Sequence, residues 1–180
     1  PKPSSAASDV YKRQDHINRF GNEVFFSARN DSTDNGLWKT DGTNITLVKD
    51  IYTGWQNSGF CSGSTYNTCS TEFQVFGDYM LFVANDGSTG PELWITDGTT
   101  AGTHLLKDIN PGSTSTNYPP KDFFVMGDVV YFSANDGTNG YELWRTDGTE
   151  TGTVLVNDIR SGSSSSTPYG FTRVDDDLYF

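Results

Sequence analysis

The sequence predicts an all-β fold built as a series of four-stranded antiparallel units, and three observations lead to this prediction. The same heptapeptide, Leu-Trp-x-Thr-Asp-Gly-Thr, occurs three times, at residues 37–43, 93–99 and 143–149. Its tryptophans are 56 and 50 residues apart, which is typical of repeat proteins whose units bury apolar faces against one another. No segment carries apolar residues at helical spacing, and short apolar runs alternate with clusters of Asp, Gly, Thr and Asn, the residues of tight turns.

Residues 123–170 show the elements of one unit most clearly. The first strand ends at the turn Gly127–Asp128, and the second is apolar on both faces, which is typical of a strand buried between two layers. A strong hairpin signal leads into the third strand, where Leu143 and Trp144 point to opposite faces. A Gly-rich turn precedes the fourth strand. We therefore expect strands at residues 123–126, 129–134, 141–146 and 153–159.

Four-stranded units of about fifty residues in series are typical of β-propeller blades. We expect a β-propeller-type array of antiparallel blades, with three blades and the start of a fourth in an incomplete ring. Trp38, Trp94 and Trp144 should stack between blades, and each buried indole N–H should need a hydrogen-bond partner. A β-sandwich would not repeat one strand order with the same tryptophan. A linear β-solenoid remains the alternative.

The alignment of the repeats also predicts the boundaries of the units. Ser4–Gln14 resembles the translation of a transposase-based sequencing adapter, so residues 1–14 are expected not to be native, and both ends of the chain are expected to be artificial. The expected units are residues 15–72 for blade 1 with a cysteine-containing insertion, 73–122 for blade 2, 123–170 for blade 3 and 171–180 for a truncated blade 4.

Two copies of the motif extend to Glu-Leu-Trp-x-Thr-Asp-Gly-Thr, at Glu92–Thr99 and Glu142–Thr149, and Gly-Thr and Asp-Ile follow at fixed distances. Over residues 15–180 the chain resembles the bacterial ELWxxDGT repeat family. The resemblance implies large secreted or surface-attached proteins built from many repeats, with no catalytic residues in the repeat itself. The first copy departs from the pattern, because Gly36 replaces the glutamate and the turn after the motif is two residues shorter.

Cys61 and Cys69 bracket a small polar loop inside the insertion of the first unit. We expect a local disulfide, because neither a metal-binding nor a Cys-x-x-Cys spacing is present, and such a bond forms in an oxidising compartment. An extracellular or cell-surface location is therefore favoured. Two unrelated free thiols are the alternative.

The formal net charge of the chain is −11, and no stretch clusters Lys or Arg. The chain therefore lacks the basic surface that nucleic acids and anionic lipids require. We expect no nucleic-acid partner and no membrane insertion.

The acidic residues are interpreted mainly as turn residues. Asp41, Asp97 and Asp147 precede Gly42, Gly98 and Gly148, where a short carboxylate caps nearby backbone N–H groups. Weak calcium candidates lie in the oxygen-rich loops, at Asp31, Asp34, Asp86 and Asp136. These loops lack the alternating carboxylates and the distal glutamate of an EF-hand site, so hairpin turns explain them sufficiently.

No catalytic constellation can be assembled from the sequence, because the two histidines, His16 and His104, do not occupy equivalent repeat positions. We expect a non-catalytic, cofactor-free segment that binds an extracellular polysaccharide or protein, or serves in adhesion to a surface matrix. One alternative is the accessory or scaffold propeller of a secreted hydrolase or lyase whose catalytic residues lie elsewhere. A second alternative is a calcium-stabilised spacer.

Overall fold

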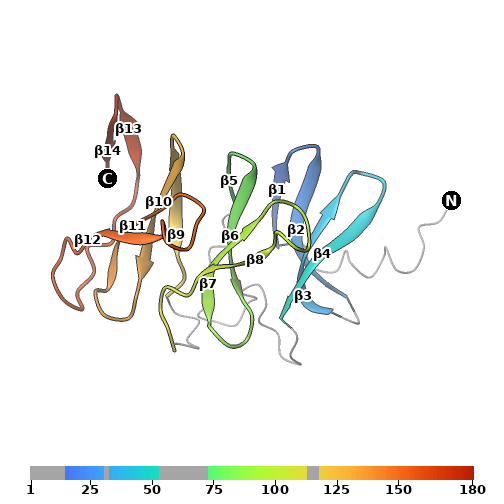
Figure 1. Ribbon diagram of the computed structural model, residues 1–180, viewed down its shortest axis with the longest axis horizontal. Coiled ribbons are helices and arrows are strands. Elements are labelled where there is room, and N and C mark those ends of the chain that lie inside the picture. The colour runs from blue at the N-terminus through green and yellow to red at the C-terminus, as the bar shows by residue number, and fades with distance from the viewer. Residues whose placement is uncertain (1–14, 31–32, 53–72, 113–117) are drawn as a thin grey trace.

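A computed structural model describes residues 15–30, 33–52, 73–112 and 118–180. These residues form fourteen strands and no helix, arranged in three four-stranded antiparallel sheets and one two-stranded sheet. The predictions of an all-β fold and of four-stranded antiparallel units are therefore confirmed. The sheets stand one after another along the chain and do not close into a ring (Figure 1).

In each sheet the strands follow the order of the sequence, so every connection within a sheet is a hairpin. Sheet 1 contains β1 (Asp15–Phe20), β2 (Glu23–Asn30), β3 (Thr33–Thr40) and β4 (Ile45–Tyr52). Sheet 2 contains β5 (Gln74–Phe76), β6 (Tyr79–Asn85), β7 (Pro91–Thr96) and β8 (His104–Lys107). Sheet 3 contains β9 (Lys121–Met126), β10 (Val129–Asn135), β11 (Tyr141–Thr146) and β12 (Val154–Asn157), and the last sheet contains β13 (Thr172–Val174) and β14 (Asp177–Tyr179).

The three motif copies occupy the same place in their sheets. Their tryptophans pair with phenylalanines of the second strand, as Phe26↔Trp38, Phe82↔Trp94 and Phe132↔Trp144. The register with the fourth strand shifts between the leucine and the tryptophan of every copy. This bulge places one extra residue in each fourth strand, and that residue is Val48, Leu106 or Val156.

The hydrophobic core consists of clusters between neighbouring sheets. Trp94 packs in a cluster with Phe25 and Leu37 of sheet 1, and Trp144 packs in a cluster with Leu81 and Leu93 of sheet 2. Because successive side chains of a strand point to opposite faces, the second motif turns Trp94 toward the preceding sheet and Leu93 toward the following one. Burying an indole in this way stabilises the stack by several kcal/mol, at ~25 cal/mol per Å² of apolar surface.

Trp38 lies on the face of sheet 1 that is turned away from sheet 2, where it packs with Phe26 and Ala28. Its Nε1 donates a hydrogen bond to the carbonyl of Ala28, at 2.9 Å. The buried Nε1 of Trp94 has no such partner among the described residues, so the expected indole hydrogen bond is wrong for this copy. Sheets 1 and 2 differ in the strand pairing beside the indole. The register of β2 and β3 shifts just after Ala28, whereas β6 and β7 stay in register to the end of β6.

The fourth strand of sheet 3 is shorter than the sequence predicts. β12 covers Val154–Asn157 rather than residues 153–159. Thr153 is held in the preceding turn, where its hydroxyl donates to the carbonyl of Thr149, and the backbone N–H of Ile159 donates to the carboxylate of Glu142. Both ends of the expected strand therefore hydrogen-bond outside the sheet ladder.

Cys61 and Cys69 lie outside the described residues, and their disulfide stays a prediction. In the part of the chain that the structure describes, no helix has the length and apolar character needed to cross a membrane.

Candidate functional site

The aspartates of the repeated motif cap their own turns. Asp97 Oδ1 accepts hydrogen bonds from the backbone N–H and the hydroxyl of Thr99, at 2.8 and 2.7 Å. Asp147 accepts the same pair from Thr149. Hydrogen bonds from the backbone N–H groups of Asn44 and Thr43 lower the pKa of Asp41 to about 2. These carboxylates are engaged in turn geometry, which leaves them little capacity for a ligand.

The residues around Asp97 and Asp147 complete a compact hydrogen-bonded turn. The hydroxyls of Thr96 and Thr103 lie 2.7 Å apart, and the Thr96 hydroxyl also accepts a hydrogen bond from the backbone of Gly98. A Cβ atom at Gly102 would overlap the Asp97 carboxylate, and Gly152 has the same relation to Asp147. The recurring Gly-Thr after Asp-Gly-Thr is therefore explained by space and hydrogen bonding within the turn.

The glycine of the turn also contacts the preceding sheet. Gly98 has a φ of +88°, and a Cβ there would lie 3.2 Å from Cζ of Phe25 in sheet 1. Gly148 has a φ of +86°, and a Cβ there would lie 2.8 Å from Cζ of Phe76 in sheet 2. The positive φ and the close aromatic ring both require glycine at this position.

Sequence reasoning missed the role of the glutamate in the motif. The buried Glu92 carboxylate accepts hydrogen bonds from the backbone N–H groups of Ile109 and Asn110, at 2.8 and 3.2 Å. Glu142 accepts the equivalent hydrogen bond from Ile159 and a second one from the backbone N–H of Ser166, further along the connection. Each glutamate therefore holds the connection that leads to the next sheet, and the available signal was a charged residue inside an otherwise buried strand.

Burial raises the pKa of Glu92 to about 7, and the nearby charges of Asp108 and Asp86 contribute to this rise. In the first copy, a Cβ at Gly36 would lie 2.7 Å from Cδ1 of Leu47 and 2.9 Å from the carbonyl oxygen of Lys49. No glutamate fits at that position.

The loops singled out as calcium candidates are hairpin turns where the structure describes them. Asp86 Oδ1 accepts hydrogen bonds from the backbone N–H groups of Ser88 and Thr89, and Asp136 does the same for the two residues that follow Gly137. Asp31 and the side chain of Asp34 lie outside the described part. Within that part, no group of three or more His, Cys, Asp or Glu residues is arranged to hold a metal ion.

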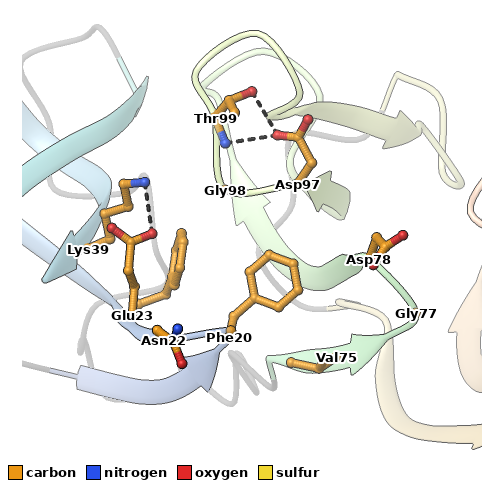
Figure 2. A pocket seen from close by; sticks show the side chains of 12 residues that line it. Phe20, Asn22, Glu23, Lys39, Val75, Gly77, Asp78, Asp97, Gly98 and Thr99 are labelled. Atoms are coloured by element: carbon orange, nitrogen blue, oxygen red, sulfur yellow. Dashed lines mark hydrogen bonds and ion pairs between the residues drawn. The ribbon is translucent and has the colours of Figure 1, made fainter. Parts of the chain in front are cut away.

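A cavity of about 650 Å³ opens between sheets 1 and 2, beside the Asp-Gly-Thr turn (Figure 2). Lys39 Nζ lies 2.9 Å from Glu23 Oε2 on the wall formed by sheet 1. The rings of Phe20 and Phe25 meet edge to face there, with centroids 5.6 Å apart. Sheet 2 contributes Val75, the turn Gly77–Asp78 and Asp97–Thr99. The cavity thus combines an apolar floor with one ion pair and two further carboxylates.

The equivalent gap between sheets 2 and 3 is built differently. The strand registers place Leu81 and Ile95 where sheet 1 has Phe25 and Lys39. Leu81 and Ile95 are at most 2% exposed and belong to the apolar cluster between the two sheets. Tyr79 follows the turn at the position of Glu23, and its ring lies against Phe76 with centroids 6.2 Å apart.

The cavity could have been suspected from the sequence, because Glu23 and Lys39 replace Tyr79 and Ile95 at aligned positions of the repeat. Sequence reasoning concentrated instead on the residues that all copies share. No protein-family model matches this chain, and no curated protein shows significant similarity to it.

Proposed function

We propose that the chain is a non-catalytic binding segment of a secreted or cell-surface bacterial protein of the ELWxxDGT repeat type. Its sheets would serve as blades of a β-propeller-type array that presents ligand-binding positions to the extracellular medium. The observation that carries this proposal is a difference between the positions that the repeats share and the positions at which they differ. The aspartates and threonines of the repeated motif, and the glutamates of its second and third copies, hydrogen-bond within the scaffold. Sheet 1, by contrast, lines the cavity with Glu23 and Lys39, which the second repeat lacks.

The stacking of the sheets supports the propeller interpretation. Sheets with the same strand order pack face to face, and Trp94 and Trp144 each fill the gap to the preceding sheet. An extracellular setting is supported by the family resemblance and by the two cysteines of the insertion, for which a disulfide is predicted.

Co-sedimentation of the purified chain with insoluble extracellular material tests this function. The materials are cellulose, chitin, peptidoglycan sacculi and collagen fibres, and an unrelated acidic protein of similar net charge is the control. We expect the chain to be retained on at least one material well above the control. Retention on none of them would contradict a binding function, and release of soluble fragments from the bound material would contradict the non-catalytic assignment.

A further inference from the structure

We propose that the cavity between sheets 1 and 2 binds the neutral sugar units of a polysaccharide. This inference rests on the binding function proposed above and names the class of its ligand. It is carried by the pairing of charges on the cavity wall, by the apolar floor, and by the contrast with the equivalent gap one repeat further along the chain.

The charges on the wall disfavour an anionic ligand, and the ion pair suits a neutral polar one. Glu23 and Lys39 form an ion pair, and their side chains are 37% and 25% exposed, so both remain open to the cavity side. Together they offer hydrogen-bond acceptors and donors within 3 Å of each other, which suits neighbouring hydroxyl groups that both donate and accept. An anionic ligand would meet the three carboxylates of Glu23, Asp78 and Asp97 against the single ammonium of Lys39, so an anionic sugar is disfavoured.

The floor of the cavity is apolar. Phe20 of sheet 1 and Val75 of sheet 2 are partly buried and line the cavity from its two sides (Figure 2). The ring of Phe25 is fully buried and meets Phe20 edge to face, so it supports the floor without being exposed to a ligand. A pyranose ring has an apolar face of C–H groups and a rim of hydroxyls, which matches an apolar floor beside a polar pair. The volume of about 650 Å³ lies within the range of roughly 300–1,000 Å³ that is usual for small-molecule sites.

The gap between sheets 2 and 3 shows that the ion pair is not required for stacking. There the aligned positions hold Tyr79 and Ile95, and the two sheets stack on an apolar cluster that includes Ile95. Lys39 is therefore a polar side chain at a position where an apolar one also supports the fold, and Glu23 stands where the second repeat has the exposed Tyr79. A polar side chain that stands where the fold would accept an apolar one is not explained by packing, and such positions are where a binding function is expected.

Affinity electrophoresis of the full chain tests the proposal. The gels contain galactomannan, xyloglucan or dextran as neutral probes, and chitosan or alginate as charged probes. The main variant, Glu23→Tyr with Lys39→Ile, gives the first gap the side chains of the second. The matched control, Val129→Tyr with Arg145→Ile, makes the same change at the equivalent positions of sheet 3. Glu23→Gln serves as a milder second variant, and thermal unfolding verifies that all variants fold.

We expect at least one neutral polysaccharide to retard the wild type and the control equally, with an apparent Kd at least tenfold higher for Glu23→Tyr/Lys39→Ile. We also expect Glu23→Gln to weaken binding measurably. Retardation by chitosan or alginate alone would overturn the ligand class, and an unchanged Kd in both cavity variants would overturn the site. If the chain co-sediments with extracellular material but no neutral probe retards it, this inference fails while the binding function stands.

Discussion

At the residue scale, Gly102 and Asp97 show how closely the positions of the turn depend on one another. A Cβ at Gly102 would overlap the Asp97 carboxylate, and the backbone of Gly102 also donates to the Thr99 hydroxyl. We predict that Gly102→Ala lowers the free energy of unfolding by about 1–3 kcal/mol, as expected for overpacking. In an Asp97→Ala background the same change should cost much less, because the overlapping carboxylate is gone. Chemical denaturation of the four proteins in this double-mutant cycle measures the coupling, and equal costs in both backgrounds would contradict the steric explanation.

Glu92 predicts a pH dependence of stability. Its folded-state pKa of about 7 lies above its ordinary value of 4.5, because burial disfavours the charged form. A raised pKa of an acid stabilises the folded state below the unfolded pKa, and this contribution is lost as the pH rises through the folded pKa. The wild type should therefore lose up to about 3 kcal/mol of stability from this group between pH 4.5 and 7.

The variant Glu92→Gln isolates this contribution, because glutamine does not titrate and its carbonyl oxygen still accepts a hydrogen bond. We expect the stability of the variant to change less between these two pH values than that of the wild type. Urea denaturation at both pH values provides the measurement. Identical pH slopes for the two proteins would show that Glu92 does not titrate in this window.

At the scale of the element, strand β11 depends on Trp144. The side chain is 7% exposed and packs against sheet 2 in the cluster that joins sheets 2 and 3. We predict that Trp144→Ala destabilises the chain by about 3–5 kcal/mol, because it leaves a large cavity in that cluster. Trp144→Phe should cost clearly less, since it retains an aromatic ring at the interface. A loss below 1 kcal/mol for Trp144→Ala, measured by thermal or urea unfolding, would contradict a packing role.

The sequence predicted the strands of the third unit well, because alternation of side chains and turn chemistry act locally. It failed where distant groups compete for the backbone: the N–H of Ile159 is taken by Glu142, which shortens β12. The missing indole partner of Trp94 was also not predicted, since it depends on the register of β6 and β7 beyond the tryptophan. The cavity was not predicted, because its walls come from two sheets whose relative placement no local pattern specifies.

At the scale of the whole molecule, the C-terminal side of sheet 3 differs from the same side of sheets 1 and 2. The bulge residues Val48 and Leu106 are 3% and 4% exposed, whereas the equivalent Val156 is 44% exposed. The isoleucines that follow show the same difference, because Ile51 and Ile109 are 4% exposed and Ile159 is 44% exposed. Sheet 3 is followed by the two-stranded sheet of β13 and β14, so the cover that a third and fourth strand provide elsewhere is absent there among the described residues.

A designed extension tests this explanation. Because Phe180 aligns with Phe132, a copy of residues 133–159 added after Phe180 would supply the third and fourth strands of the last sheet. We predict that the extended chain buries Val156 and Ile159 and melts at a higher temperature, by about 2–4 °C for each kcal/mol gained. The matched control is the same extension with serine at its copies of Leu143 and Trp144. Equal melting temperatures for the two extended chains, measured by circular dichroism, would contradict the prediction.

The contact between a turn glycine and an aromatic ring of the preceding sheet, seen at Gly98 with Phe25 and at Gly148 with Phe76, bears on how such a chain lengthens by gene duplication. Sheet 2 carries both halves of the contact, the glycine for its predecessor and the ring for its successor. A tandem duplicate of that unit therefore carries both the glycine and the ring that its neighbours need, and no new complementary surface has to arise by mutation. Copy number is then free to vary between descendants while the spacing of neighbouring units is inherited unchanged.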